Sequence, residues 1–183
     1  MTSFTITDEK QIETAREIFS DLSAMNDLLE EAANGEIEAA VAPADLYAFA
    51  LGTAGAKAVK VEAALRDSAN VRTAFQNLLA RVSEFHLPQA IAAASDDVTS
   101  REGNNCRISI QLSQAAPDQV YVIVELTRAG SRLPKVMHMV GTGEIYHRAE
   151  LPEFHDGIAQ LIVESGSKII SLIQDPDTEV FLK

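Results

Sequence analysis

The sequence predicts an α+β protein, with an all-helical N-terminal domain followed by a C-terminal antiparallel β-sandwich. Up to about residue 94, apolar residues recur three or four positions apart, which is the spacing of one helix face. From Cys106 onward, apolar residues recur at every second position in short runs separated by turn-forming residues, as sandwich strands do. We therefore predict a helical domain over residues 1–94, a linker over 95–105 and a β-sandwich over 106–183.

The first predicted element is a helix of about 25 residues that starts after a capping Thr7 and stops at Gly35, either unbroken or broken near Ala24. Its apolar residues form one stripe in which a polar residue fills a single slot: Ile12, Ala15, Phe19, Leu22, Asn26, Leu29 and Ala33. The stripe could be the seam of a dimer, with Asn26 fixing the register. Because the stripe covers barely three heptads, we expect it instead to pack onto its own domain.

Three short helices are predicted next. Pro43 opens the first of them, over about 44–51, because proline is tolerated in a first helical turn. Gly52 and Gly55 break the chain, and two further helices follow, joined near residues 67–70. The sequence Leu87-Pro88 ends the last of them. Helices this short are unstable alone and must dock on something.

The residues of these helices resemble the helical domain of bacterial anti-sigma factors. The zinc-binding form of that family carries a short helix ending in Leu-Gly, a polar turn, and then Val-Glu-Ala-His-Leu-x-x-Cys-x-x-Cys-Arg. The matching run here is VEAALRDSANVR, residues 61–72, and it places Ala64, Ser68 and Val71 where the family has its zinc histidine and two cysteines. The resemblance spans about 40 residues and implies the family's helical scaffold without its metal site, so we expect no metal and no cofactor.

The C-terminal half predicts seven or so short strands. The first two form a hairpin around Ala116-Pro117-Asp118, because proline and aspartate favour turns. The expected strand cores are residues 108–112, 120–126, 136–140, 145–147, 158–163, 169–173 and 179–182.

The composition argues against several classes of function. A net charge of −12 is unsuited to nucleic acid as a direct ligand, because phosphate binding needs lysine and arginine. Residues 1–45 hold eleven acidic and two basic residues, which indicates either attraction to a basic partner or a solvated acidic helix face. No apolar run is long enough to span a membrane, and the N-terminus does not read as a signal peptide, so we expect a cytoplasmic protein without a membrane partner.

Catalytic motifs are missing from the sequence, and we expect the protein not to be an enzyme. There is no phosphate-binding Gly-x-x-x-x-Gly-Lys-Ser/Thr run and no Gly-x-Ser-x-Gly elbow. His147, Glu153 and His155 lie near one another in the chain, but their spacing is not a recognised metal-ligand pattern. His138, inside an apolar strand, is expected to be a hydrogen-bonded sheet residue, and Cys106, the single cysteine, a structural one.

The resemblance implies a function. Anti-sigma factors of this type wedge between the two domains of an extracytoplasmic-function sigma factor and cover the surfaces that hold RNA polymerase. In this chain, the large residues suited to anchor such a partner are Tyr47, Phe49 and Phe75, with Leu46 and Leu51 around them. The alternative for each of these five residues is that it fills the core of the helical domain.

Two other functions are compatible with the sequence. One is a non-enzymatic interaction or scaffold module, possibly homodimeric, whose β-sandwich binds a ligand or peptide. The other is a small hydrolase or ligand-binding protein that uses the region of His147 and His155, which requires a deep polar pocket where the two rings converge.

Overall fold

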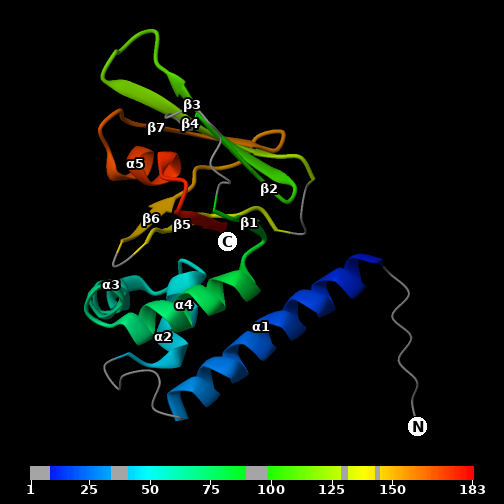
Figure 1. The fold of residues 1–183 in the computed structure, drawn as a ribbon. Helices are drawn as coiled ribbons and strands as arrows, with labels where there is room; N and C mark the ends of the chain where they lie inside the picture. Colours follow the sequence, from blue (N-terminus) through cyan, green and yellow to red (C-terminus); the bar gives the residue numbers. More distant parts are fainter. Residues whose placement is uncertain (1–8, 34–40, 90–98, 129–131, 143–144) are drawn as a thin grey trace.

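The computed structural model describes residues 9–33, 41–89, 99–128, 132–142 and 145–183, and it contains helices and two antiparallel sheets (Figure 1). Within these residues, four α-helices come first in the chain and a fifth lies among the strands, and a short 3-10 helix, Gly55–Lys57, precedes the third α-helix. The helices are α1 (Glu9–Ala33), α2 (Pro43–Ala50), α3 (Ala58–Asp67), α4 (Ala69–Val82) and α5 (Lys168–Gln174). The strands are β1 (Phe85–Leu87), β2 (Ser100–Gly103), β3 (Cys106–Leu112), β4 (Gln119–Leu126), β5 (Val136–Val140), β6 (Tyr146–Glu150), β7 (Ile158–Glu164) and β8 (Glu179–Leu182).

Each sheet has four strands. The first sheet has the order β1-β8-β5-β6 and the second has the order β2-β3-β4-β7, with every pair antiparallel. The predicted hairpin is confirmed, because Ile108 pairs with Val124 and Leu112 pairs with Val120. The strand β8 lies between β1 and β5 and pairs with both, so it is an inner strand of the first sheet.

The first sheet is covered on both faces. Phe181 of β8 belongs to the same buried cluster as the residues of α2, α3 and α4, and Tyr146 of β6 packs against that cluster. Met137 and Met139 of β5 belong to the other cluster, together with residues of β3 and β4. The helices α2–α4 therefore cover one face of this sheet and the second sheet covers the other, which gives the three layers seen in Figure 1.

The helix α1 is continuous through Ala24, so the unbroken form of the predicted helix is the correct one. The expected cap Thr7 and stop Gly35 lie outside the described residues. Ala24 and Leu28 are buried in the helical cluster and attach α1 to α2 and α4. Polar contacts add to this attachment: the Ser20 hydroxyl donates to the carbonyl of Arg81 at 3.2 Å, and the Arg81 guanidinium pairs with Asp27.

Three predictions about regular structure are wrong. Residues 100–103 of the predicted linker form β2, in which Arg101 is buried and donates to the carbonyls of Pro88 and Thr178. The predicted strand at 169–173 is the helix α5, since a short apolar run fits a strand and a buried helix equally well. The helix predicted to end at Leu87-Pro88 ends at Val82, and Phe85–Leu87 form β1. Because β1 pairs with β8, the first sheet draws strands from both predicted domains.

Candidate interaction surface

The most exposed apolar surface on the helices lies along α1. We call the residues Ile12, Ala15, Phe19, Leu22, Asn26 and Leu29 the α1 seam, and all six are exposed. Phe19 is 75% exposed, Leu22 64% and Leu29 52%. The expectation that this stripe packs onto its own domain is therefore wrong.

The physical reason is that α1 docks through its opposite side. Ala24 and Leu28 are 2% and 3% exposed, and they lie on the side of Ser20 and Asp27, which contact α4. These two buried apolar residues act together with the hydrogen bond from Ser20 and the ion pair of Asp27, both made to Arg81. Phe19, Leu22 and Leu29 are left facing solvent, and exposed apolar patches are a common feature of protein interaction sites.

Three of the five predicted partner-binding residues lie in the core. Leu46, Phe49 and Phe75 are each no more than 1% exposed. The Phe49 and Phe75 rings pack 5.6 Å apart, and each lies within 6 Å of the Tyr146 ring. In this conformation these side chains have no surface to offer a partner, because packing in the helical core takes up all of it.

The other two predicted residues are partly exposed. The Tyr47 hydroxyl is hydrogen-bonded to the Asp21 carboxylate of α1, and burial, reinforced by that carboxylate, raises the pKa of Tyr47 to about 12. Tyr47 therefore helps to hold α1 in place. Leu51 follows α2 and lines a groove of about 720 Å³ whose other wall includes Leu133 and Leu151.

The corner between α3 and α4 is closed without metal ligands. Ser68 is 5% exposed, and its hydroxyl oxygen accepts a hydrogen bond from the backbone N–H of Val71 at 3.4 Å, which caps α4. Val71 is fully buried. The Arg72 guanidinium donates to the carbonyls of Leu65 and Arg66 at 2.9 and 2.8 Å, so it ties the start of α4 to the end of α3.

His138 joins the first sheet to the helices, and the prediction of a hydrogen-bonded sheet histidine is confirmed. Its Nε2 donates to the carbonyl of Ala50 at 3.0 Å, and its Nδ1 accepts from the hydroxyl of Tyr146 at 2.8 Å. Burial lowers the pKa of His138 to about 4, an effect that the nearby Arg148 reinforces and the bond to Ala50 opposes. The ring is therefore neutral at pH 7.

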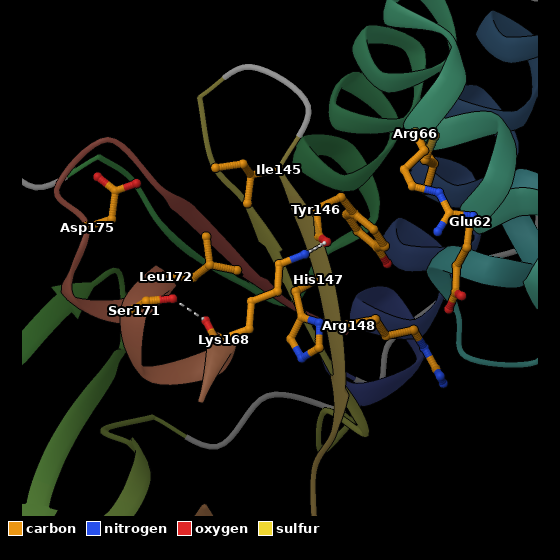
Figure 2. A pocket seen from close by; sticks show the side chains of 11 residues that line it. Glu62, Arg66, Ile145, Tyr146, His147, Arg148, Lys168, Ser171, Leu172 and Asp175 are labelled. Atoms are coloured by element: carbon orange, nitrogen blue, oxygen red, sulfur yellow. Dashed lines mark hydrogen bonds between the residues drawn. The ribbon is translucent and has the colours of Figure 1, made fainter. Parts of the chain in front are cut away.

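A charged groove of about 780 Å³ lies between α3, β6 and α5 (Figure 2). Glu62 and Arg66 of α3 form one side, and Lys168 of α5 reaches over to donate to the carbonyl of Tyr146 at 2.9 Å. His147 lines the groove, and burial, with Lys168 beside it, lowers the pKa of its ring. The groove is open, and both acidic and basic side chains line it. This arrangement does not point to a particular reaction.

The candidate metal residues are not brought together. His147 lines the charged groove, Glu153 lines the groove beside Leu51, and His155 is an exposed residue bridged to Ile158. Across the part of the chain that the structure describes, no group of three or more His, Cys, Asp or Glu side chains is placed to hold a metal ion.

Cys106 is buried at 3% exposure in the cluster between the two sheets, and burial raises the pKa of its thiol to about 11. Such a thiol is protonated at neutral pH and behaves as a small apolar side chain.

Comparisons with protein-family models, with curated proteins and with solved structures find no match to this chain. Within the described residues, no helix combines the length and the apolar character needed to cross a bilayer. The fold and the α1 seam define a mixed helix-and-sheet protein that exposes an apolar helix face.

Proposed function

We propose that this protein is a non-enzymatic regulator that represses transcription by sequestering an extracytoplasmic-function sigma factor in the cytoplasm. Sequestration makes and breaks no bond, so it requires only an exposed apolar surface with large side chains to anchor the partner. The observation that carries the proposal is the α1 seam, where Phe19, Leu22 and Leu29 are each more than half exposed.

The arrangement of α2, α3 and α4 supports a sigma factor as the partner. A short helix ends at Ala50 and is capped by Leu51, Gly52 breaks the chain, and two helices follow with Ser68 at the turn between them. This is the order of elements that the resemblance to anti-sigma factors implies. The Ser68 cap and the Arg72 contacts connect α3 to α4 where zinc does so in the metal-binding form.

The contact surface that we propose differs from the one expected from the sequence. Leu46, Phe49 and Phe75 lie in the same buried cluster as Ala24 and Leu28 of α1, and the α1 seam makes the contact with the partner. Acidic residues on the same helix, such as Glu13 and Glu30, give it a negative charge that attracts a basic partner and raises the rate of association.

The test is capture of a sigma factor by the purified full-length chain. Tagged extracytoplasmic-function sigma factors of the source genome serve as baits, and bound pairs are then added to transcription reactions with RNA polymerase. We expect one sigma factor to be retained and its transcription to fall. Phe19→Glu and Leu22→Glu should abolish both effects, whereas Val59→Glu, at a 73% exposed site on α3, should abolish neither. Failure of every bait to bind would overturn the proposal.

A second candidate function, a homodimeric interaction or scaffold module, is favoured by the spacing of the seam residues. They alternate three and four positions apart without interruption from Ile12 to Leu29, which is the heptad pattern of a helix that pairs with another helix.

A further inference from the structure

We infer that the free protein is a parallel homodimer in which the α1 seams of two copies pair, and that a sigma factor must displace the second copy to bind. The pairing stands on the spacing and exposure of the seam alone. Only the competition between the second copy and a sigma factor for the α1 seam rests on the proposed function.

The seam has the geometry of a two-stranded coiled coil. Numbering the heptad from Ile12 as position a puts Phe19 and Asn26 at the next two a positions, and Ala15, Leu22 and Leu29 at the d positions. All of these residues are exposed and lie on one continuous helix. Ile12 and Asn26 at a positions, with Leu22 and Leu29 at d positions, favour two parallel strands over larger bundles.

The attachment of α1 to its own chain leaves the seam free. The residues that dock α1 are Ser20, Asp21, Ala24, Asp27 and Leu28. In the same numbering they occupy positions b, c and f, which face outward in a coiled coil. The remainder of each chain would therefore lie on the outside of the pair, and Figure 1 shows α1 extending past the ends of α2 and α4.

Asn26 selects the parallel arrangement. In parallel pairing the two Asn26 side chains face each other at an a position, where their amides can hydrogen-bond across the seam. In antiparallel pairing about the middle of the seam, each Asn26 would face Ala15, and its amide would have no partner there. In the single chain Asn26 is exposed, and its amide nitrogen donates to the Glu30 carboxylate at 2.9 Å. In the dimer this exposed hydrogen bond can be replaced by one to the Asn26 amide of the second copy.

The flanks of the seam do not oppose pairing. In a parallel pair the g and e positions that meet are Gln11 with Arg16, Ile18 with Ser23, and Met25 with Glu30. None of these pairs places two like charges together. Ile18, which is 50% exposed, adds apolar area beside Phe19 and Leu22.

The size of the seam sets the strength of the dimer. A helix of 25 residues is about 37 Å long, and a seam of three heptads is smaller than the roughly 800 Å² per partner of a standard interface. The net charge of −12 on each chain also opposes association at low salt. We therefore expect a dissociation constant of about 1–100 μM that falls when salt is added.

Sedimentation equilibrium of the full chain, from about 1 to 300 μM, tests the inference. We expect the mass to rise from 19.8 kDa toward twice that value. Leu22→Glu and Phe19→Glu should each raise the dissociation constant at least 30-fold, by roughly 2 kcal/mol at RT ln 30. Val59→Glu should leave it unchanged. Because these side chains are exposed, circular dichroism should report the same helix content in every variant. A monomer at the highest concentration, or a larger oligomer, would overturn the inference.

The orientation is tested with Ile12→Cys. In a parallel dimer the two introduced thiols face each other at an a position, and mild oxidation should give a covalent dimer. In an antiparallel dimer Ile12 faces Leu29, and no such bond forms. The native Cys106 is buried and does not compete. A dimer of normal affinity that fails to cross-link would rule out the parallel register.

The two proposals can fail separately. Dimerisation is measured on this chain alone, so its failure leaves sigma-factor capture to be judged by the pull-down. If both hold, the cross-linked Ile12→Cys dimer should not capture the sigma factor until a reductant is added. Capture of the sigma factor by the oxidised dimer would overturn the inference that the two partners compete for the α1 seam.

Discussion

His138 donates a hydrogen bond from Nε2 to the carbonyl of Ala50 across 3.0 Å, and this bond joins the strand β5 to the end of the helix α2. The same ring accepts a hydrogen bond from the Tyr146 hydroxyl. A neutral imidazole can make both bonds at once, as donor at one nitrogen and acceptor at the other. Protonation of the ring would remove the acceptor at Nδ1 and place a charge in a buried site, so this arrangement requires the neutral form of His138.

Stability should fall as the pH is lowered from 6.5 to 4. Burial lowers the pKa of His138 from 6.5 to about 4 in the folded protein, so between these values the unfolded chain binds a proton that the folded chain does not. This group alone should lower the free energy of unfolding by roughly 3 kcal/mol as the pH falls from 6.5 to 4. Well above pH 6.5 the group is neutral in both the folded and the unfolded chain, so its contribution to stability no longer depends on pH. Urea unfolding at a series of pH values measures it. His138→Gln keeps a donor for Ala50 but cannot titrate, and its curve should be flatter by that amount. Equal slopes for the two proteins would contradict this assignment.

Substitution by alanine should have a large effect on stability at Phe49 and almost none at Phe19. Phe49 is 1% exposed in the helical core, and Phe49→Ala should lower the free energy of unfolding by about 3–5 kcal/mol. Phe19 is 75% exposed, and Phe19→Ala should change it by no more than about 0.5 kcal/mol when the chain is dilute enough to be monomeric. Urea unfolding of both variants at low protein concentration measures the two changes in the free energy of unfolding. A large loss for Phe19→Ala would mean that α1 packs on its own chain through the seam.

The break after α2 depends on Gly52. Its φ is +74°, and a Cβ at this residue would lie 2.5 Å from Cγ2 of the buried Val136. Gly52→Ala should therefore cost about 2–4 kcal/mol, from backbone strain and overpacking together. Gly55 is the matched control, because its φ is +54° but no atom lies within 4 Å of the added Cβ. Gly55→Ala should show the strain alone, about 1–2 kcal/mol. Thermal unfolding of the two variants side by side checks the difference.

The cap of α4 should be worth a small, measurable amount. Ser68→Ala removes the oxygen that accepts from the N–H of Val71, and it should lower the free energy of unfolding by about 0.5–2 kcal/mol. Ser68→Thr keeps an accepting hydroxyl and should recover most of that loss. Denaturant unfolding of both variants provides the comparison. If alanine and serine were equally stable at this site, the Arg72 contacts alone would hold the corner between α3 and α4.

Much of the local structure followed from the sequence. The three-and-four spacing from Ile12 to Leu29 predicted a long helix, and the two-residue alternation around Ala116-Pro117-Asp118 predicted the β3–β4 hairpin. Gly52 predicted where α2 ends, and the join expected near residues 67–70 agrees with the start of α4 at Ala69. These features depend on periodicity, turn residues and capping, which act between residues close in the chain.

The placement of side chains did not follow from the sequence. Phe49 and Phe19 both lie on predicted helix faces, yet only the packing of β8 and β6 onto α2–α4 decides that Phe49 is buried. Likewise, the polar run that contains Arg101 resembles a linker until the carbonyls of Pro88 and Thr178, distant in the chain, receive its guanidinium. Periodicity alone determined that α1 has an apolar stripe. Which side of α1 faces the protein was decided by contacts between segments far apart in the chain, because Arg81 and the helical core hold the other side.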